Sequence, residues 1–158
     1  DNVFTAVDVL KGEQTVGNHS VIVGGGLVGC EIAIWLADQQ KTATIVEMLP
    51  ELMVGGATVP IQVKMMTQDL LNNHQVSIQT ATKVQEILAD GIVCIDKSGK
   101  NRFLKADTII LATGMIANSQ LPNDIEAQFD HVYRIGDCRV PKNVMSAIWD
   151  AYEIARFI

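Results

Sequence analysis

Residues 21–33 read VIVGGGLVGCEIA, and this stretch decides the fold. It joins a short β-branched strand, residues 20–23, to a run in which apolar residues recur at helical spacing. Between the strand and the helix lies the pattern GxGxxG, formed by Gly24, Gly26 and Gly29. The glycine pattern alone is a weak signal. A strand before it and a helix after it supply the setting that a dinucleotide-binding unit requires.

Each glycine of the pattern has a predicted task. Gly24 permits the tight turn, Gly26 lets the backbone approach a pyrophosphate, and Gly29 lets the helix lie close to the first strand. The N–H groups and the positive end of the helix dipole would attract the anion. A glycine turn without a ligand is the alternative. The predicted cofactor contacts of this loop are Gly24, Gly25, Gly26, Leu27, Val28 and Gly29.

Glu47 is the residue that predicts which dinucleotide binds. It ends a second strand, residues 42–47, and follows Gly29 by 18 residues, where a carboxylate would receive the adenosine ribose hydroxyls. Its charge would repel a 2′-phosphate, and residues 48–50 contain no arginine or histidine. We therefore expect NAD(H) rather than NADP(H), although a solvated glutamate at a strand end is the alternative.

Three further residues are weaker candidates for the cofactor site. Glu31 lies in the first helical turn, where the helix dipole alone favours a carboxylate, so a structural role competes with a binding role. Thr113 and Gly114 follow a continuous apolar strand, residues 108–112, at the edge where open α/β sheets bind ligands. We expect Gly114 near the nicotinamide, because a glycine there lets a flat ring come close.

The remaining pattern predicts an α/β fold, a Rossmann-type doubly wound parallel sheet with an antiparallel β-meander crossover. A helix over about residues 60–73 carries an apolar face, and a third strand follows at residues 76–80, which completes a βαβαβ order. That helix face consists of Ile61, Met65, Met66 and Leu70. Turn signals then separate three short strands that replace a crossover helix. They cover residues 83–88, 92–96 and 102–105.

The composition argues against several other classes of protein. A net charge of −6 without a block of lysines or arginines predicts no nucleic acid partner. No apolar run reaches the roughly 20 residues of a membrane span, and the first residues lack the order of a signal peptide, so we expect a cytoplasmic protein. The three histidines and three cysteines lack metal-site spacing. No Ser/His/Asp grouping, paired-carboxylate spacing or activated cysteine is evident, so no catalytic residue is predicted. Hydride transfer from a nicotinamide to a flavin would need none, because the cofactors carry the chemistry.

Four segments carry a resemblance to a known family. The chain resembles the C-terminal NAD(P)-binding region of the 2,4-dienoyl-CoA reductase, enoate reductase and trimethylamine dehydrogenase group of NADH:flavin oxidoreductases, which is pyridine nucleotide-disulfide oxidoreductase-like. GGGLVGCE with EMLPE is fairly specific to this group, whereas ATG and GD recur in many flavoproteins. The segments are VIVGGGLVGCEIA (21–33), TIVEMLPEL (44–52), ADTIILATGM (106–115) and VYRIGDC (132–138).

The resemblance implies a domain of a longer enzyme that passes hydride from NADH to FAD to reduce an enoate or enoyl-type substrate. Residues 19–116 would form the NAD(H)-binding domain, with residues 1–18 as a lead-in remnant of the FAD domain and residues 117–158 as its return segment. Gly136 and Asp137 would be the flavin-side motif. The partners would be the FAD and barrel domains of the same chain. FMN and an iron–sulfur cluster would belong to those other parts.

The resemblance also raises the question of how the return segment packs. We expect a strand at residues 132–136 that adds beside the strand at residues 108–112, because an isolated strand would leave backbone groups unpaired. The last helix would follow at residues 144–157 with an apolar stripe. That stripe consists of Val144, Ile148, Ala151, Tyr152 and Ala155.

Two other functions remain open at this point. A free-standing NAD(H)-binding sensor module would use the same glycine turn without catalysis. An S-adenosylmethionine-dependent methyltransferase also combines a glycine-rich first loop with an acid after the second strand, but the third glycine, Gly29, and the meander argue against it. Titration with S-adenosylmethionine and NADH would separate these functions.

Overall fold

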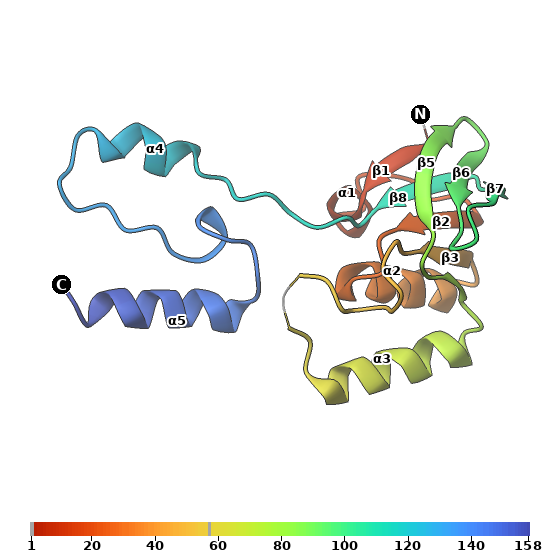
Figure 1. Ribbon diagram of the computed structural model, residues 1–158, viewed down its shortest axis with the longest axis horizontal. Helices are drawn as coiled ribbons and strands as arrows, with labels where there is room; N and C mark the ends of the chain where they lie inside the picture. Colours follow the sequence, from red (N-terminus) through yellow and green to blue (C-terminus); the bar gives the residue numbers. More distant parts are fainter. Residues whose placement is uncertain (1, 57) are drawn as a thin grey trace. The chain divides into compact units, whose positions relative to one another are not determined.

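The computed structural model describes residues 2–56 and 58–158 and divides the chain into two compact units (Figure 1). Unit 1 comprises Asp1–Gly114 and unit 2 comprises Met115–Ile158. Residue 1, part of the predicted lead-in, lies outside the described residues. Each unit is described by itself.

Unit 1 is built on a five-stranded parallel sheet with the order β1-β8-β2-β3-β4. The centre of the sheet is formed by Ile22 of β2, which pairs with Ile45 of β3 on one side and with Ile110 of β8 on the other. The strands are β1 (Val3–Thr5), β2 (His19–Val23), β3 (Thr42–Val46), β4 (Ser77–Gln79) and β8 (Thr108–Leu111). This sheet confirms the predicted Rossmann-type α/β class.

Helices cover one face of this sheet, and a small antiparallel sheet packs on the other. Ile22 points into a core shared with α1 (Ala6–Leu10), α2 (Leu27–Asp38) and α3 (Ile61–Asn73). Its neighbour Val21 points the opposite way, into a second core that includes Ile92 and Cys94 of the meander. Ile22 and Val21 point to opposite faces of the sheet because successive side chains alternate along a strand. The antiparallel meander thus takes the place of a helix on that face.

The meander itself confirms the predicted crossover. Its strands β5 (Lys83–Leu88), β6 (Gly91–Ile95) and β7 (Asn101–Lys105) pair antiparallel in chain order. The β6–β7 turn is held by Asp96, whose Oδ1 accepts hydrogen bonds from the N–H groups of Ser98 and Lys100 at 2.9 and 3.2 Å. Gly99 has a positive φ of 79°, which the turn requires.

The segment predicted as a lead-in forms a strand and a helix that join the sheet of unit 1. β1 pairs with β8 through Val3↔Ile109, and α1 follows at once. Thr5 caps α1: its hydroxyl accepts the N–H of Asp8 at 3.2 Å, and the Asp8 carboxylate accepts the N–H of Thr5 at 3.3 Å. This reciprocal capping stabilises a helix too short to show a periodic pattern.

Unit 2 contradicts the predicted strand at residues 132–136. Residues 132–135 have no strand structure, and β1 occupies the position beside β8 that this strand was expected to take. Unit 2 instead contains α4 (Gln120–Glu126), the 3₁₀ turn η1 (Gly136–Cys138) and α5 (Val144–Ala155). The edge of β8 is already paired, so a further strand has no backbone partner there.

The predicted apolar faces of two helices are also exposed. On α3, Ile61, Met65 and Met66 are more than half exposed and Leu70 is half-buried, whereas Thr67 and Leu71 are the buried residues. On α5, the described residues include no buried side chain, so the predicted stripe lies at the surface of unit 2. Helical periodicity identified the apolar faces but could not show what packs on them.

Candidate dinucleotide-binding site

Two glycines of the GxGxxG pattern are required by close backbone contacts. A Cβ atom on Gly24 would lie 2.4 Å from the carbonyl oxygen of Ala112, and Gly24 also has a positive φ of 112°. A Cβ atom on Gly29 would lie 2.0 Å from the carbonyl oxygen of Gly24. Side chains at either position would force β2, β8 and α2 apart. These contacts match the turn and close-packing tasks predicted for the two residues.

Gly26 differs from the other two glycines because it faces open space. It is the N-cap of α2, and a Cβ atom built on it would meet no atom within 4 Å. No side chain of the described residues caps α2, and its first turn contains no acidic residue, so the prediction that Glu31 lies in the first turn is wrong. The first N–H groups of an α-helix, here those of Leu27 and Val28, have no partner within the helix. The helix therefore presents backbone donors beside an unfilled space, which is what an anion requires.

Glu47 lies directly after β3 and points at the glycine turn. Its Oε2 accepts the N–H of Gly25 at 2.6 Å, and its Oε1 accepts the N–H of Leu49 at 2.7 Å. The backbone of Glu47 is fixed by the carbonyl of Gln79 and the N–H of Thr82, each at 2.9 Å. The half-buried carboxylate is thus held at the place that the sequence argument required. Its contact with a ribose stays a prediction.

A loop after β3 packs against the glycine turn, and sequence reasoning missed this contact. The N–H of Met53 donates to the carbonyl of Gly25 at 2.8 Å, and the side chains of Leu52 and Met53 are 5% and 6% exposed. Met53 has a positive φ of 56°, which is unusual for a residue other than glycine. The sequence analysis did not identify Leu52 and Met53 as a buried apolar pair.

Thr113 and Gly114 lie at the same sheet edge as the glycine turn. They follow Ala112, whose carbonyl oxygen borders Gly24. Both are exposed, and Gly114 has a positive φ of 98° with no atom within 4 Å of a Cβ built on it. The chain thus leaves β8 with a small exposed turn beside the helix N-terminus. This placement agrees with the prediction for Gly114, while the approach of a nicotinamide there remains untested.

Cys30 and Glu31 lie side by side in α2 but differ in environment. Glu31 is exposed, whereas Cys30 is fully buried. Burial, followed by the negative charges of Glu31 and Glu47, raises the pKa of the Cys30 thiol to about 12. A thiol of this kind is protonated at neutral pH and is a poor nucleophile. The Cys30 thiol is therefore not activated for nucleophilic chemistry.

Gly136 and Asp137 belong to unit 2 and form a turn of their own. Gly136 has a positive φ of 60°, and its N–H donates to Asp150 Oδ2 at 3.1 Å. The other oxygen of Asp150 accepts Arg139 Nη1 at 2.8 Å. Asp137 is exposed and accepts the N–H of Lys142 at 3.4 Å. Asp150 holds this turn from α5, a role that no sequence motif indicated.

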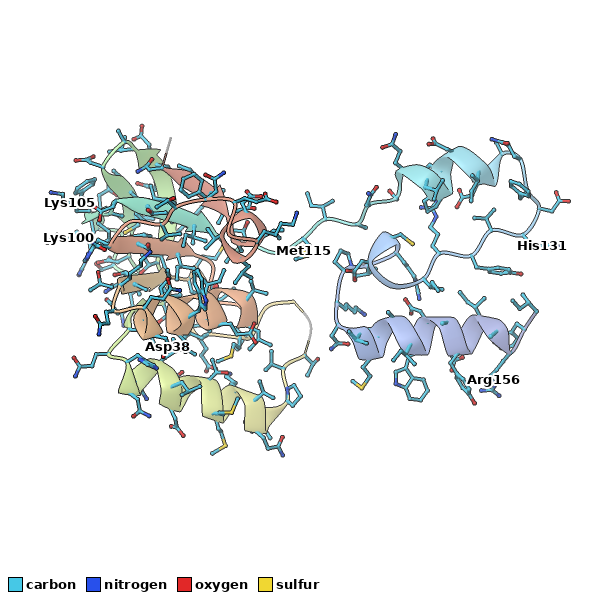
Figure 2. The ribbon with its side chains drawn as sticks, turned by 180° about the vertical axis from the view of Figure 1, so that it is seen from behind. Asp38, Lys100, Lys105, Met115, His131 and Arg156 are labelled. Carbon is cyan, nitrogen blue, oxygen red and sulfur yellow. The ribbon has the colours of Figure 1, made fainter. Side chains whose placement is uncertain are left out.

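A cavity of about 240 Å³ lies at the opposite, amino-terminal edge of the sheet in unit 1. Its lining includes His19, Lys41 and His74. Lys41 Nζ donates to the carbonyl of Val16 at 2.7 Å, and His74 lies 3.3 Å from Asp38 at the end of α2, labelled in Figure 2. Lys41 and His74 follow the C-terminal ends of α2 and α3, where positive charge is favourable.

Two further features concern other classes of site. Within residues 2–56 and 58–158, no group of three or more His, Cys, Asp or Glu side chains is arranged to hold a metal ion. In the same part of the chain, no helix combines the length and apolar character that would be needed to cross a membrane.

Comparison with known proteins identifies a matching family and several similar proteins. Residues 2–151 match the family model of the pyridine nucleotide-disulphide oxidoreductases. The cinnamate reductase of Clostridium sporogenes is 34% identical over 100% of this chain and 24% of its own length. The NADH oxidase of Thermoanaerobacter brockii is 33% identical over 97% of this chain and 24% of its own length. The chain thus spans about a quarter of the length of these curated relatives.

Solved structures give a consistent result. The 2-naphthoyl-CoA reductase, in its complex with 2-naphthoyl-CoA, superposes with a TM-score of 0.89 at 26% identity, covering 100% of this chain and 24% of that one. An FAD-dependent pyridine nucleotide-disulphide oxidoreductase from Desulfovibrio vulgaris has a TM-score of 0.58 at 30% identity, covering 78% of this chain and 32% of that one.

Proposed function

This chain belongs to the pyridine nucleotide-disulphide oxidoreductase family, and on that premise we propose that its unit 1 is the NADH-binding domain of a flavin-dependent oxidoreductase. The domain would receive NADH at the carboxyl edge of the sheet and present it to FAD. The family match favours this function over the methyltransferase considered above.

One observation carries the proposal: an uncapped helix N-terminus and a fixed carboxylate lie on either side of the same glycine turn. Gly26 opens the space in front of α2, while Gly25 connects the turn to Glu47 through its N–H. A dinucleotide has two groups that fit these features, a pyrophosphate and an unphosphorylated ribose diol. Each Glu47 oxygen accepts one backbone bond and keeps acceptor capacity for a hydroxyl.

The residues of this chain would bind and orient the cofactor, and the cofactor pair supplies the redox chemistry when it is bound, by hydride transfer. The first-turn N–H groups of α2 would hold the pyrophosphate, and Glu47 would accept hydrogen bonds from the ribose hydroxyls. Gly114 would leave room for a flat ring beside the end of β8. No protein proton donor or acceptor is needed for this step, which agrees with the buried, protonated thiol of Cys30.

The flavin and the substrate would be bound partly or wholly by other parts of a longer protein. Gly136 and Asp137 are the residues of this chain that we assign to the flavin side, with their turn fixed by Asp150. The names cinnamate reductase and 2-naphthoyl-CoA reductase support an unsaturated acid or its thioester as the substrate class. A cytoplasmic location is part of the same proposal.

Fluorescence titration of the 158-residue chain with NADH and NADPH tests the cofactor assignment. We expect tighter binding of NADH, because Glu47 accepts hydroxyl donors and repels a phosphate. Glu47→Ala should weaken NADH binding and narrow the difference between the cofactors. Equal affinities for the two cofactors in both proteins would overturn the assignment.

Gly26→Val tests the pyrophosphate position separately. Gly26 has a φ of −67°, which any residue can adopt, and its Cβ position is open, so the side chain should fill the space without disturbing the fold. We expect NADH affinity to fall by roughly tenfold or more while the thermal unfolding midpoint stays close to that of the wild type. Unchanged NADH affinity in a folded variant would remove the pyrophosphate from this position.

A further inference from the structure

The carboxylate of Glu47 is held in the manner of a bound anion. Its two oxygens accept backbone N–H groups at 2.6 Å from Gly25 and 2.7 Å from Leu49. Both bonds are shorter than the ordinary N–H···O distance of about 2.9 Å, as expected for a charged acceptor. The two donors come from different loops, the glycine turn and the segment after β3, and converge on one negatively charged group.

These two donors are fixed by contacts that do not involve the Glu47 side chain. The carbonyl of Gly25 accepts the N–H of Met53 at 2.8 Å, and the carbonyl of Leu49 accepts the N–H of Ala81 at 2.8 Å. Gly25 is buried. Removal of the Glu47 side chain should therefore leave both N–H groups in place, still pointing at the space that the carboxylate occupied.

We propose that the N–H groups of Gly25 and Leu49 form a built-in phosphate-binding pair that Glu47 occupies with its own carboxylate. The selectivity against NADPH then has two origins, the repulsion by Glu47 and the occupation of the backbone donors that a 2′-phosphate would use. This inference rests on the proposed function, since it places the 2′ position of the ribose beside Glu47. Phosphate oxygens are acceptors for the same N–H groups that a carboxylate satisfies.

Three variants separate the two origins of the selectivity against NADPH, charge repulsion and occupied backbone donors. Glu47→Ala removes the charge and frees both N–H groups. Glu47→Gln also removes the charge, but its amide oxygen still accepts one N–H and its NH₂ group faces the other. Glu51→Ala is the matched control, because Glu51 carries the same charge in the same loop, is exposed and, among the described residues, bonds to Lys64 alone, at 3.4 Å.

Titration with NADPH is the first measurement. We expect Glu47→Ala to bind NADPH roughly tenfold or more tightly than the wild type, with a clearly smaller gain for Glu47→Gln and little change for Glu51→Ala. Equal gains in Glu47→Ala and Glu47→Gln would show that loss of repulsion is sufficient, and would overturn the proposal. No gain in either variant would overturn it as well.

Thermal unfolding with inorganic phosphate is the second measurement, and it requires no nucleotide. The freed N–H of Gly25 is buried, so Glu47→Ala should unfold at a lower temperature, and phosphate should restore part of that loss when compared with chloride at equal ionic strength. Phosphate bound at the N-terminus of α2 would stabilise all the proteins alike, so the response of Glu47→Ala should clearly exceed that of the wild type and Glu51→Ala. An equal response of all the proteins would contradict the proposal.

The two measurements also distinguish this inference from the proposed function. If the wild type binds neither NADH nor NADPH, the proposed function fails, whereas a phosphate response confined to Glu47→Ala would still support the paired donors. If the wild type prefers NADH but Glu47→Ala responds to neither phosphate nor NADPH, the paired donors are refuted and the NADH site remains.

Discussion

The two units of this chain bury their apolar residues to very different extents. Among the described residues, every fully buried hydrophobic side chain lies in unit 1, and Leu36 of α2 is 0% exposed. In unit 2, Ile148 and Trp149 of α5 are 63% and 57% exposed. Unit 1 therefore has the hydrophobic core that folding requires. Unit 2 has an apolar helix face but no hydrophobic core of its own.

This difference indicates how the two units gain stability. Burial of apolar surface is the dominant favourable contribution to folding, so unit 1 should be stable by itself. Unit 2 has its polar turn in place, with Asp150 bonded to Gly136 and Arg139, but few apolar contacts behind it. Its exposed helix face agrees with the proposal that residues 117–158 belong to a domain whose other parts lie outside this chain.

The largest expected difference between the units is the loss of unfolding free energy when one buried and one exposed side chain are truncated. We expect Leu36→Ala to lower the free energy of unfolding by about 3 kcal/mol, because it leaves a cavity in the core. Ile148→Ala should change it by less than about 0.5 kcal/mol. Urea denaturation followed by circular dichroism measures both values. Similar losses in the two variants would show that α5 is packed as firmly as α2.

Cysteine reactivity should sharpen the same contrast. Cys30 is 0% exposed with a pKa raised to about 12, and burial also raises the pKa of Cys94, whereas Cys138 in unit 2 is only half-buried. Labelling with a thiol reagent under native conditions should modify Cys138 at least about tenfold faster than the other two. Cys138→Ser should remove the fast phase. Rapid labelling of Cys30 in that variant would argue against a closed core in unit 1.

The smallest expected effect concerns the pH dependence of the meander. Hydrogen bonds from the Ser98 hydroxyl and then the Lys100 N–H lower the pKa of Asp96 well below its ordinary value of 3.8. Because the folded pKa is the lower one, this stabilisation is present above about pH 4 and is lost as the pH falls further. Asp96→Asn should therefore show a shallower acid loss of thermal stability than the wild type.

Ser98→Ala serves as the control for this pH prediction. It keeps the Asp96 carboxylate but removes the hydroxyl that lowers its pKa most. Its acid loss should fall between those of the wild type and Asp96→Asn. An acid loss identical in all three proteins would mean that Asp96 contributes nothing to the pH dependence.

Sequence reasoning was most successful where local chemistry and periodicity agree. The strands and helices between residues 19 and 112, including the meander, were predicted to within one or two residues. The reason is that β-branched runs, glycine turns and helical spacing all mark them. The positions of Gly24, Gly29 and Glu47 relative to one another were also anticipated, since a βαβ unit fixes the edge at which they meet.

The failures have physical reasons. α1 was missed because a capping box, rather than a periodic pattern, supports its five residues. The strand expected at residues 132–136 is absent because pairing depends on a free sheet edge, which a sequence pattern cannot reveal. Leu52 and Met53 were missed because a positive φ at Met53 leaves no mark in composition.

The position of β8 has a consequence for how this protein assembles during synthesis. β8 is the last of the five strands to leave the ribosome, yet it inserts between β1 and β2. Val3 of β1 therefore cannot pair until Ile109 of β8 has been synthesised. The pair β2–β3 and then β4 can associate earlier, with short separations. A contact between such distant residues slows folding. Until residue 111 emerges, the edges of β1 and β2 that β8 later covers stay unpaired. A chaperone would be needed most during that interval.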